Sequence, residues 1–116
     1  MKHTLIILLI SLTSLYSQTY KAVLKYKGEV SDSIHWISQE TINNKFTINK
    51  QSITIEDNKY TFKLLKRISN NNNELIYYAK DWEDLRCYII IETFEGYKYI
   101  YFQWSNLIVG YKIIRI

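Results

Sequence analysis

Residues 87–104 read CYIIIETFEGYKYIYFQW, and this stretch decides the fold class. The centre of its first half, Cys87 to Phe94, is apolar at consecutive positions, so both faces of an extended segment are apolar there. Glu95-Gly96 then interrupts the run, and glycine supplies the positive φ that a tight hairpin turn needs. The stretch therefore predicts two antiparallel strands joined by a short turn, the first of them in the middle of a sheet.

Alternating apolar and polar residues, which are typical of half-buried strands, continue on both sides of this hairpin. They recur in residues 20–26, 46–48, 53–55, 60–64, 75–79 and 107–114. The breaks at Asp57-Asn58 and Ser105-Asn106 are too short for a parallel crossover, so neighbouring strands must be antiparallel. Residues 31–40 fit either a capped helical turn or a strand, and we favour the strand.

These patterns predict an all-β fold, an antiparallel meander of roughly seven or eight strands. Such a sheet must cover its apolar face and hide its edges, so it closes into a small barrel or folds into a sandwich. In the first strand, we expect the apolar face to be made by Tyr20, Ala22, Leu24 and Tyr26. Lys21, Lys25 and Lys27 would then form a solvated basic face on the opposite side.

The first seventeen residues have the order of a secretory signal peptide: a positive start with Lys2, the apolar run Leu5–Leu12, then small and polar residues to Ser17. A membrane span needs about twenty apolar residues, so we expect export without a permanent membrane anchor. We predict a signal peptide at 1–17 and one β-rich domain at 18–116, located in the periplasm or outside the cell.

Charge and cysteine content narrow the function classes further. The formal net charge of the chain is +4, which is too mild to indicate a nucleic-acid partner. The single cysteine cannot build a disulfide framework, so the fold has to rest on its core. We expect no cofactor.

Two groups of residues are candidates for chemistry. Asp81, Glu83 and Asp84 place three carboxylates in one short segment, but the alternating spacing and glycine of a calcium loop are missing, so we expect a solvated acidic turn. Cys87 and His35 are the residue types of a thiol nucleophile and its base, yet Cys87 falls in the most apolar strand and is expected in the core. We therefore predict that the protein has no catalytic residues and no metal site, and that it is not an enzyme.

Tyrosines make the most distinctive candidate site. Tyr97, Tyr99 and Tyr101 share one face of a predicted strand, and Tyr88 on the neighbouring strand extends it. Such a row suits a protein, peptide or glycan, although ordinary cross-strand aromatic pairing gives the same pattern. We predict a non-catalytic binding module that uses this aromatic face. The alternatives are a lipocalin-like carrier of a small apolar ligand and, third, a hydrolase that uses Asp81, Glu83 or Asp84.

Three segments carry a resemblance at the level of pattern: SLYSQ, NKFTINKQSITIEDNKYTFKLL and ELIYYAKDWEDLRCYIIIETFEGYKYIYF. Together they resemble the small exported β-proteins common in Bacteroidota, over most of residues 1–17 and 45–104. The resemblance implies export and a β-rich fold, and it implies no activity. The architecture is also similar to lipocalin-like barrels, but the Gly-x-Trp motif of their first strand is missing, because Trp36 does not follow Gly28 at that spacing.

Overall fold

The computed structural model describes residues 18–55, 59–71 and 73–116. Over these ranges the chain forms eight strands, β1 (Gln18–Val30), β2 (Ile34–Ile48), β3 (Ser52–Ile55), β4 (Tyr60–Asn70), β5 (Glu74–Lys80), β6 (Arg86–Phe94), β7 (Tyr97–Trp104) and β8 (Leu107–Arg115). The predicted signal peptide at 1–17 and the predicted turn at Asp57-Asn58 lie outside the described residues. The strand that we favoured for residues 31–40 is the first half of β2.

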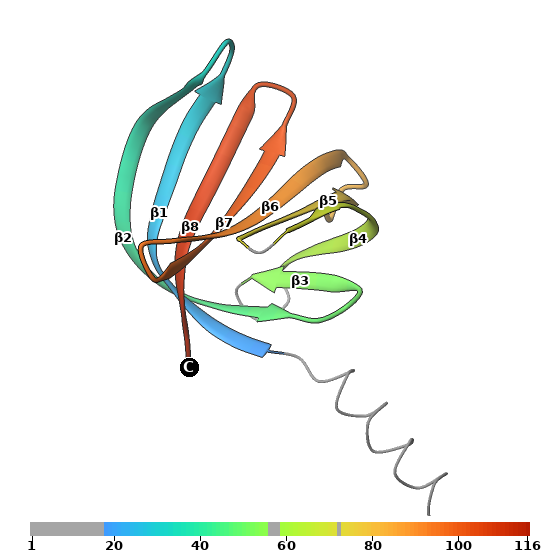
Figure 1. The fold of residues 1–116 in the computed structure, drawn as a ribbon, viewed down its shortest axis with the longest axis horizontal. Helices are drawn as coiled ribbons and strands as arrows, with labels where there is room; N and C mark the ends of the chain where they lie inside the picture. Colours follow the sequence, from blue (N-terminus) through green and yellow to red (C-terminus); the bar gives the residue numbers. More distant parts are fainter. Residues whose placement is uncertain (1–17, 56–58, 72) are drawn as a thin grey trace, which may run out of the picture.

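Each strand pairs antiparallel with its neighbour in the chain, and β8 pairs with β1 to close a barrel (Figure 1). The all-β meander is therefore confirmed, and of the two predicted architectures the barrel is the correct one. The pairing between β2 and β3 is the short one in this closed barrel, because among the described residues β2 pairs with β3 only over Phe46–Ile48. The rest of β2, from Ile34, is paired with β1 alone within the described residues.

The two hairpin turns beside β7 have the backbone that their residues predict. Glu95 and Gly96 both have positive φ, 52° and 80°, as the tight turn between β6 and β7 requires. Ser105, in the turn between β7 and β8, also has a positive φ of 45°. Both turns therefore match the breaks in the sequence pattern.

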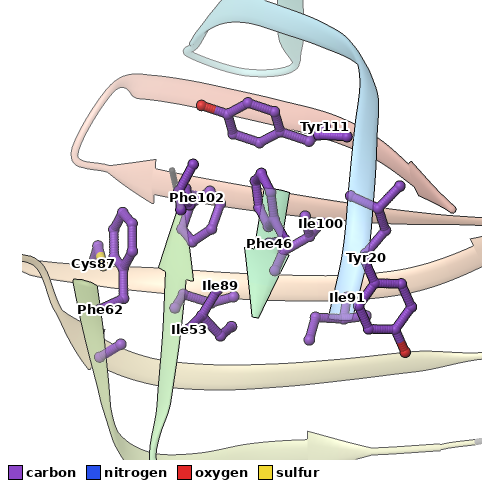
Figure 2. Packing of buried hydrophobic residues seen from close by; sticks show 14 residues of the cluster. Tyr20, Phe46, Ile53, Phe62, Cys87, Ile89, Ile91, Ile100, Phe102 and Tyr111 are labelled. Atoms are coloured by element: carbon purple, nitrogen blue, oxygen red, sulfur yellow. The ribbon is translucent and has the colours of Figure 1, made fainter. Parts of the chain in front are cut away.

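The core is made by the inward-facing residues of alternate positions. The largest fully buried side chains in it are Phe46, Ile53, Phe62, Ile89, Ile100, Phe102 and Ile113. Figure 2 shows side chains of this core, among them Phe46, Ile53 and Phe102, pointing from several strands into one interior. Phe62 and Phe102 stack with ring centres 4.2 Å apart, and Phe46 meets the edge of Tyr111 at 4.9 Å.

A β-bulge overturns the predicted faces of β1. Ala22 lies opposite Ile113 of β8 and Leu24 lies opposite Lys112, so Val23 has no partner on β8. One extra residue exchanges the two faces of the strand beyond it. Leu24 and Tyr26 therefore leave the interior side, and the prediction of a continuous apolar face from Tyr20 to Tyr26 is wrong.

The same bulge changes the position of two lysines. Beyond it, Lys25 lies opposite Tyr111 and Lys27 opposite Val109, both on the inward side of β8. The prediction that Lys21, Lys25 and Lys27 share one solvated face is therefore wrong, because Lys25 and Lys27 lie on the inward side of β1 and Lys21 does not. Lys25 is half-buried there, and Lys27 is exposed.

Candidate functional site

One end of the barrel is hollow. The β1–β2, β5–β6 and β7–β8 connections lie at this end, because alternate turns of an antiparallel meander share an end (Figure 1). A cavity of about 500 Å³ opens there, and we call it the cup. Its aromatic lining consists of Tyr60, Phe62, Trp82, Phe102, Trp104 and Tyr111.

The aromatic rings of the cup contact one another from wall to floor. Trp82 lies 4.6 Å from Tyr60 and 5.4 Å from Phe62, measured between ring centres. Trp104 lies 5.8 Å from Phe62 and 6.4 Å from Trp82. Phe62 and Phe102 also belong to the buried core, so the floor of the cup is the top of that core. Trp82 is 46% exposed, and its ring forms part of the rim.

Asp81 holds the wall of the cup together. This carboxylate is 6% exposed and accepts three hydrogen bonds. Its Oδ1 accepts from the backbone N–H groups of Glu83 at 2.8 Å and Leu85 at 2.9 Å. Its Oδ2 accepts from the indole Nε1–H of Trp104 at 2.8 Å. The residue considered for hydrolysis therefore fixes the β5–β6 loop and orients Trp104.

Lys25 and Lys27 line the cup from β1. The Lys25 ammonium lies 5.9 Å from the centre of the Tyr111 ring. In the described ranges, the ion pair within 4.0 Å is that of Lys80 with Asp84, at 3.1 Å, and neither Lys25 nor Lys27 has a carboxylate that close. Besides Asp81 and the two lysines, the lining contains one more charged residue, Glu83 of the β5–β6 loop.

A second, smaller hollow lies on the outer face of the barrel. It has a volume of about 370 Å³, and its aromatic lining is Tyr26, Trp36, Tyr99 and Tyr101. Trp36 lies across two glycines: a Cβ on Gly28 would come 2.9 Å from Trp36 Cε3, and a Cβ on Gly110 would come 3.6 Å from Trp36 Cη2. Burial, and then the charge of Glu92, raise the pKa of the Tyr101 phenol, so it stays protonated.

The four predicted tyrosines lie on this outer face, but only two of them meet. Tyr99 and Tyr101 stack with ring centres 6.4 Å apart and planes 6° apart, and both line the outer hollow. The Lys112 ammonium lies over the Tyr97 ring at 3.6 Å. Tyr88 is opposite Tyr78 on β5, with ring centres 5.6 Å apart, and it does not line the hollow.

Sequence reasoning missed Trp36 and Tyr26 as partners of these tyrosines. A register shift beside Ile37 puts Trp36 opposite Gly28, and two glycines without side chains give its ring room. The recognisable signal was the pair of glycines in long strands, Gly28 in β1 and Gly110 in β8, because glycine within a strand often marks close approach of another group.

The structure does not bring the other candidates together. Cys87 is 2% exposed inside the barrel, and burial, followed by the charge of Asp81, raises the pKa of its thiol to about 12. His35 is exposed on β2, opposite Glu29. Among the described residues there is no group of three His, Cys, Asp or Glu side chains that fits a metal ion.

Comparison of the chain with protein-family models, with curated proteins and with solved structures finds no match. Nor does the described part of the chain contain a helix with the length and hydrophobicity that a membrane crossing needs. Function therefore has to be argued from the two hollows themselves.

Proposed function

We propose that the protein is a non-catalytic binding module whose cup holds a small, largely apolar ligand. The observation that carries this proposal is the convergence of six aromatic side chains on an open cavity of about 500 Å³. Ligand sites in proteins are concave, mainly apolar, roughly 300–1,000 Å³ in volume, and equipped with a few polar groups. The cup has these properties, and its polar groups are Lys25, Lys27, Asp81 and Glu83.

The packing below the cup supports the same proposal. A barrel of this size has room for side chains and one small ligand. Here the core fills the other end, with Phe46, Ile53 and Ile100 fully buried, while Trp82 and Trp104 stay partly accessible at the mouth. The protein thus keeps apolar surface open where a ligand fits, and burying that surface gives a ligand its binding free energy.

A neutral fluorescent naphthalene, N-phenyl-naphthylamine, tests this proposal. We expect saturable fluorescence enhancement, and Trp82→Ala should weaken binding about tenfold because it removes an aromatic wall that contributes roughly 0.5–1.5 kcal/mol beyond its buried area. Phe94→Ala is the matched control, since Phe94 is an aromatic residue, 59% exposed, that does not line the cup. Absence of saturable binding, or equal loss in both variants, would contradict the proposal.

The outer hollow is a second candidate, favoured by one observation: Trp36, Tyr26, Tyr99 and Tyr101 form a concave aromatic surface beside Ser38 and Gln39. Aromatic faces with polar rims suit sugar rings or a peptide. A panel of immobilised glycans tests it with the double variant Tyr99→Ala/Tyr101→Ala. The control is Tyr78→Ala/Tyr88→Ala, a tyrosine pair outside the hollow. Retention that both variants reduce equally, or no retention at all, would reject this candidate.

We propose in addition that the protein acts outside the cytoplasm, on the strength of the charge and hydropathy order of residues 1–17. The mass of the protein isolated from its own cells tests this. A mass that corresponds to residues 18–116 supports export, and an intact N-terminus on a cytoplasmic protein contradicts it.

A further inference from the structure

Lys25 and Lys27 are unusual residues in the lining of the cup, because they are charged. Every other strand that contributes to the cup lines it with apolar or aromatic residues, such as Phe62, Phe102 and Val109. A regular period-two strand would have placed Lys25 and Lys27 outside the barrel. The bulge at Val23 instead turns them inward, and β-bulges recur where a strand must re-aim a functional side chain.

No carboxylate of the described residues lies within 4.0 Å of either ammonium group. Glu40 of β2 is opposite Lys25 in the strand pairing and Glu29 follows Lys27 on the same side of β1, but neither glutamate lines the cup. Asp81 lines the same cup, but its two oxygens accept three hydrogen bonds from the β5–β6 loop and Trp104. Glu83 belongs to the same loop, and β5 stands four strands from β1 in a barrel of eight, which is the far side. The two β1 residues that line the cup are therefore both positively charged, and the rest of the lining is mainly aromatic and apolar, so the two ends of a bound molecule meet different surroundings.

We infer that Lys25 and Lys27 bind the anionic group of the ligand, which makes the cup a site for an amphipathic anion. Its apolar or aromatic body packs against Trp82, Trp104 and Phe62. Its carboxylate, sulfonate or phosphate group faces the two ammonium groups, where charge-assisted hydrogen bonds are stronger than neutral ones. This inference rests on the proposed function of the cup and adds the chemical class of its ligand.

Two probes of similar size separate the inference from the proposal on which it rests. Anilinonaphthalene sulfonate is anionic, and N-phenyl-naphthylamine has nearly the same ring system without the charge. We expect the wild-type protein to bind the anion more tightly than the neutral probe. Lys25→Gln/Lys27→Gln should weaken anion binding about tenfold, because hydrogen bonds to charged groups are lost, and should leave neutral binding unchanged.

Lys21→Gln is the matched control. Lys21 is also on β1, but it precedes the bulge and does not line the cup, so both probes should bind this variant as they bind wild type. Lys25→Glu/Lys27→Glu extends the series, and anion affinity should fall further in the order Lys, Gln, Glu. Circular dichroism and the thermal midpoint of each variant establish that the barrel is folded, so that a loss of binding reports on the site.

The outcomes are distinguishable. If both probes bind, and the lysine variants weaken the binding of both probes equally or leave both unchanged, the inference of an anionic ligand is wrong, while the cup remains a ligand site. If the anion alone binds and its binding depends on Lys25 and Lys27, the inference stands, and the cup is a ligand site that requires the anionic group. If neither probe binds, both are overturned.

Discussion

Replacing Asp81 by asparagine tests whether the hydrogen bond between Trp104 and Asp81 Oδ2 stabilises the protein. The side chain keeps its shape, and the amide oxygen in the place of Oδ1 still accepts from the N–H groups of Glu83 and Leu85. The amide nitrogen takes the place of Oδ2 and points a donor at the Trp104 indole N–H, which loses its acceptor. A hydrogen bond to a charged group contributes about 1.5–3 kcal/mol. We therefore expect Asp81→Asn to lower the free energy of unfolding by about 2 kcal/mol.

Urea unfolding, followed by circular dichroism and tryptophan fluorescence, measures this loss. Asp84→Asn is the matched control, because Asp84 makes an exposed ion pair with Lys80 and such pairs contribute about 0–1 kcal/mol. In a Trp104→Phe background the indole N–H is absent, so the cost of Asp81→Asn should shrink sharply. An Asp81→Asn protein within about 0.5 kcal/mol of wild type, or an equal cost in both backgrounds, would refute the reasoning.

Three further predictions concern the core, the thiol and the outer face. Phe102 is 1% exposed, so Phe102→Ala should lower the free energy of unfolding by about 3–5 kcal/mol. Phe94 is 59% exposed, so Phe94→Ala should lower it by less than about 0.5 kcal/mol in the same denaturation experiment. Because the pKa of Cys87 is raised to about 12, its reactive thiolate is scarce below that pH, and iodoacetamide should label the folded protein slowly at pH 8 and rapidly in urea; fast labelling of the folded state would contradict this. A Cβ on Gly110 would lie 2.5 Å from Tyr101 Cδ1, so Gly110→Ala should destabilise the protein by about 1–3 kcal/mol, and Tyr101→Ala should relieve most of that cost.

Much of the fold was predictable from residue pattern. Phe46, Ile53, Phe62 and Ala79 all lie on the apolar side of period-two segments, and all four are buried in the core. Glu95-Gly96 has the positive φ values of a tight hairpin. These features depend on local backbone geometry and on burial of one face, which the sequence of each strand specifies by itself.

The faces of β1 beyond Ala22 could not be predicted in this way. Leu24 and Tyr26 continue the alternation of Tyr20 and Ala22 without any local break, so nothing in the segment marks Val23 as a bulge. The bulge is set by the pairing of β1 with β8 and β2, which lie far apart in the chain or across a hairpin. A single unpaired residue then decides whether two lysines lie on the outer face of the barrel or line the cup.

The candidate site was predicted only in part for the same reason. Tyr99 and Tyr101 were recognisable as neighbours because they are two residues apart on one strand. The cup unites residues of β1, β3, β4, β7 and β8 with the β5–β6 loop, and no spacing in the sequence connects Lys25 with Trp82. Asp81 looked like part of an acidic turn, and its role became visible only through its hydrogen bond to Trp104.

The three tryptophans of the chain allow one experiment that tests the central claim directly. Trp82 and Trp104 line the cup, while Trp36 lines the outer hollow. In a nitrogen–proton correlation spectrum, each indole N–H gives its own signal during a titration with anilinonaphthalene sulfonate. We predict that the signals of Trp82 and Trp104 shift together and saturate, while that of Trp36 stays in place. A shift of Trp36 alone, or no saturable shift of any of the three, would contradict the assignment of the cup as the binding site.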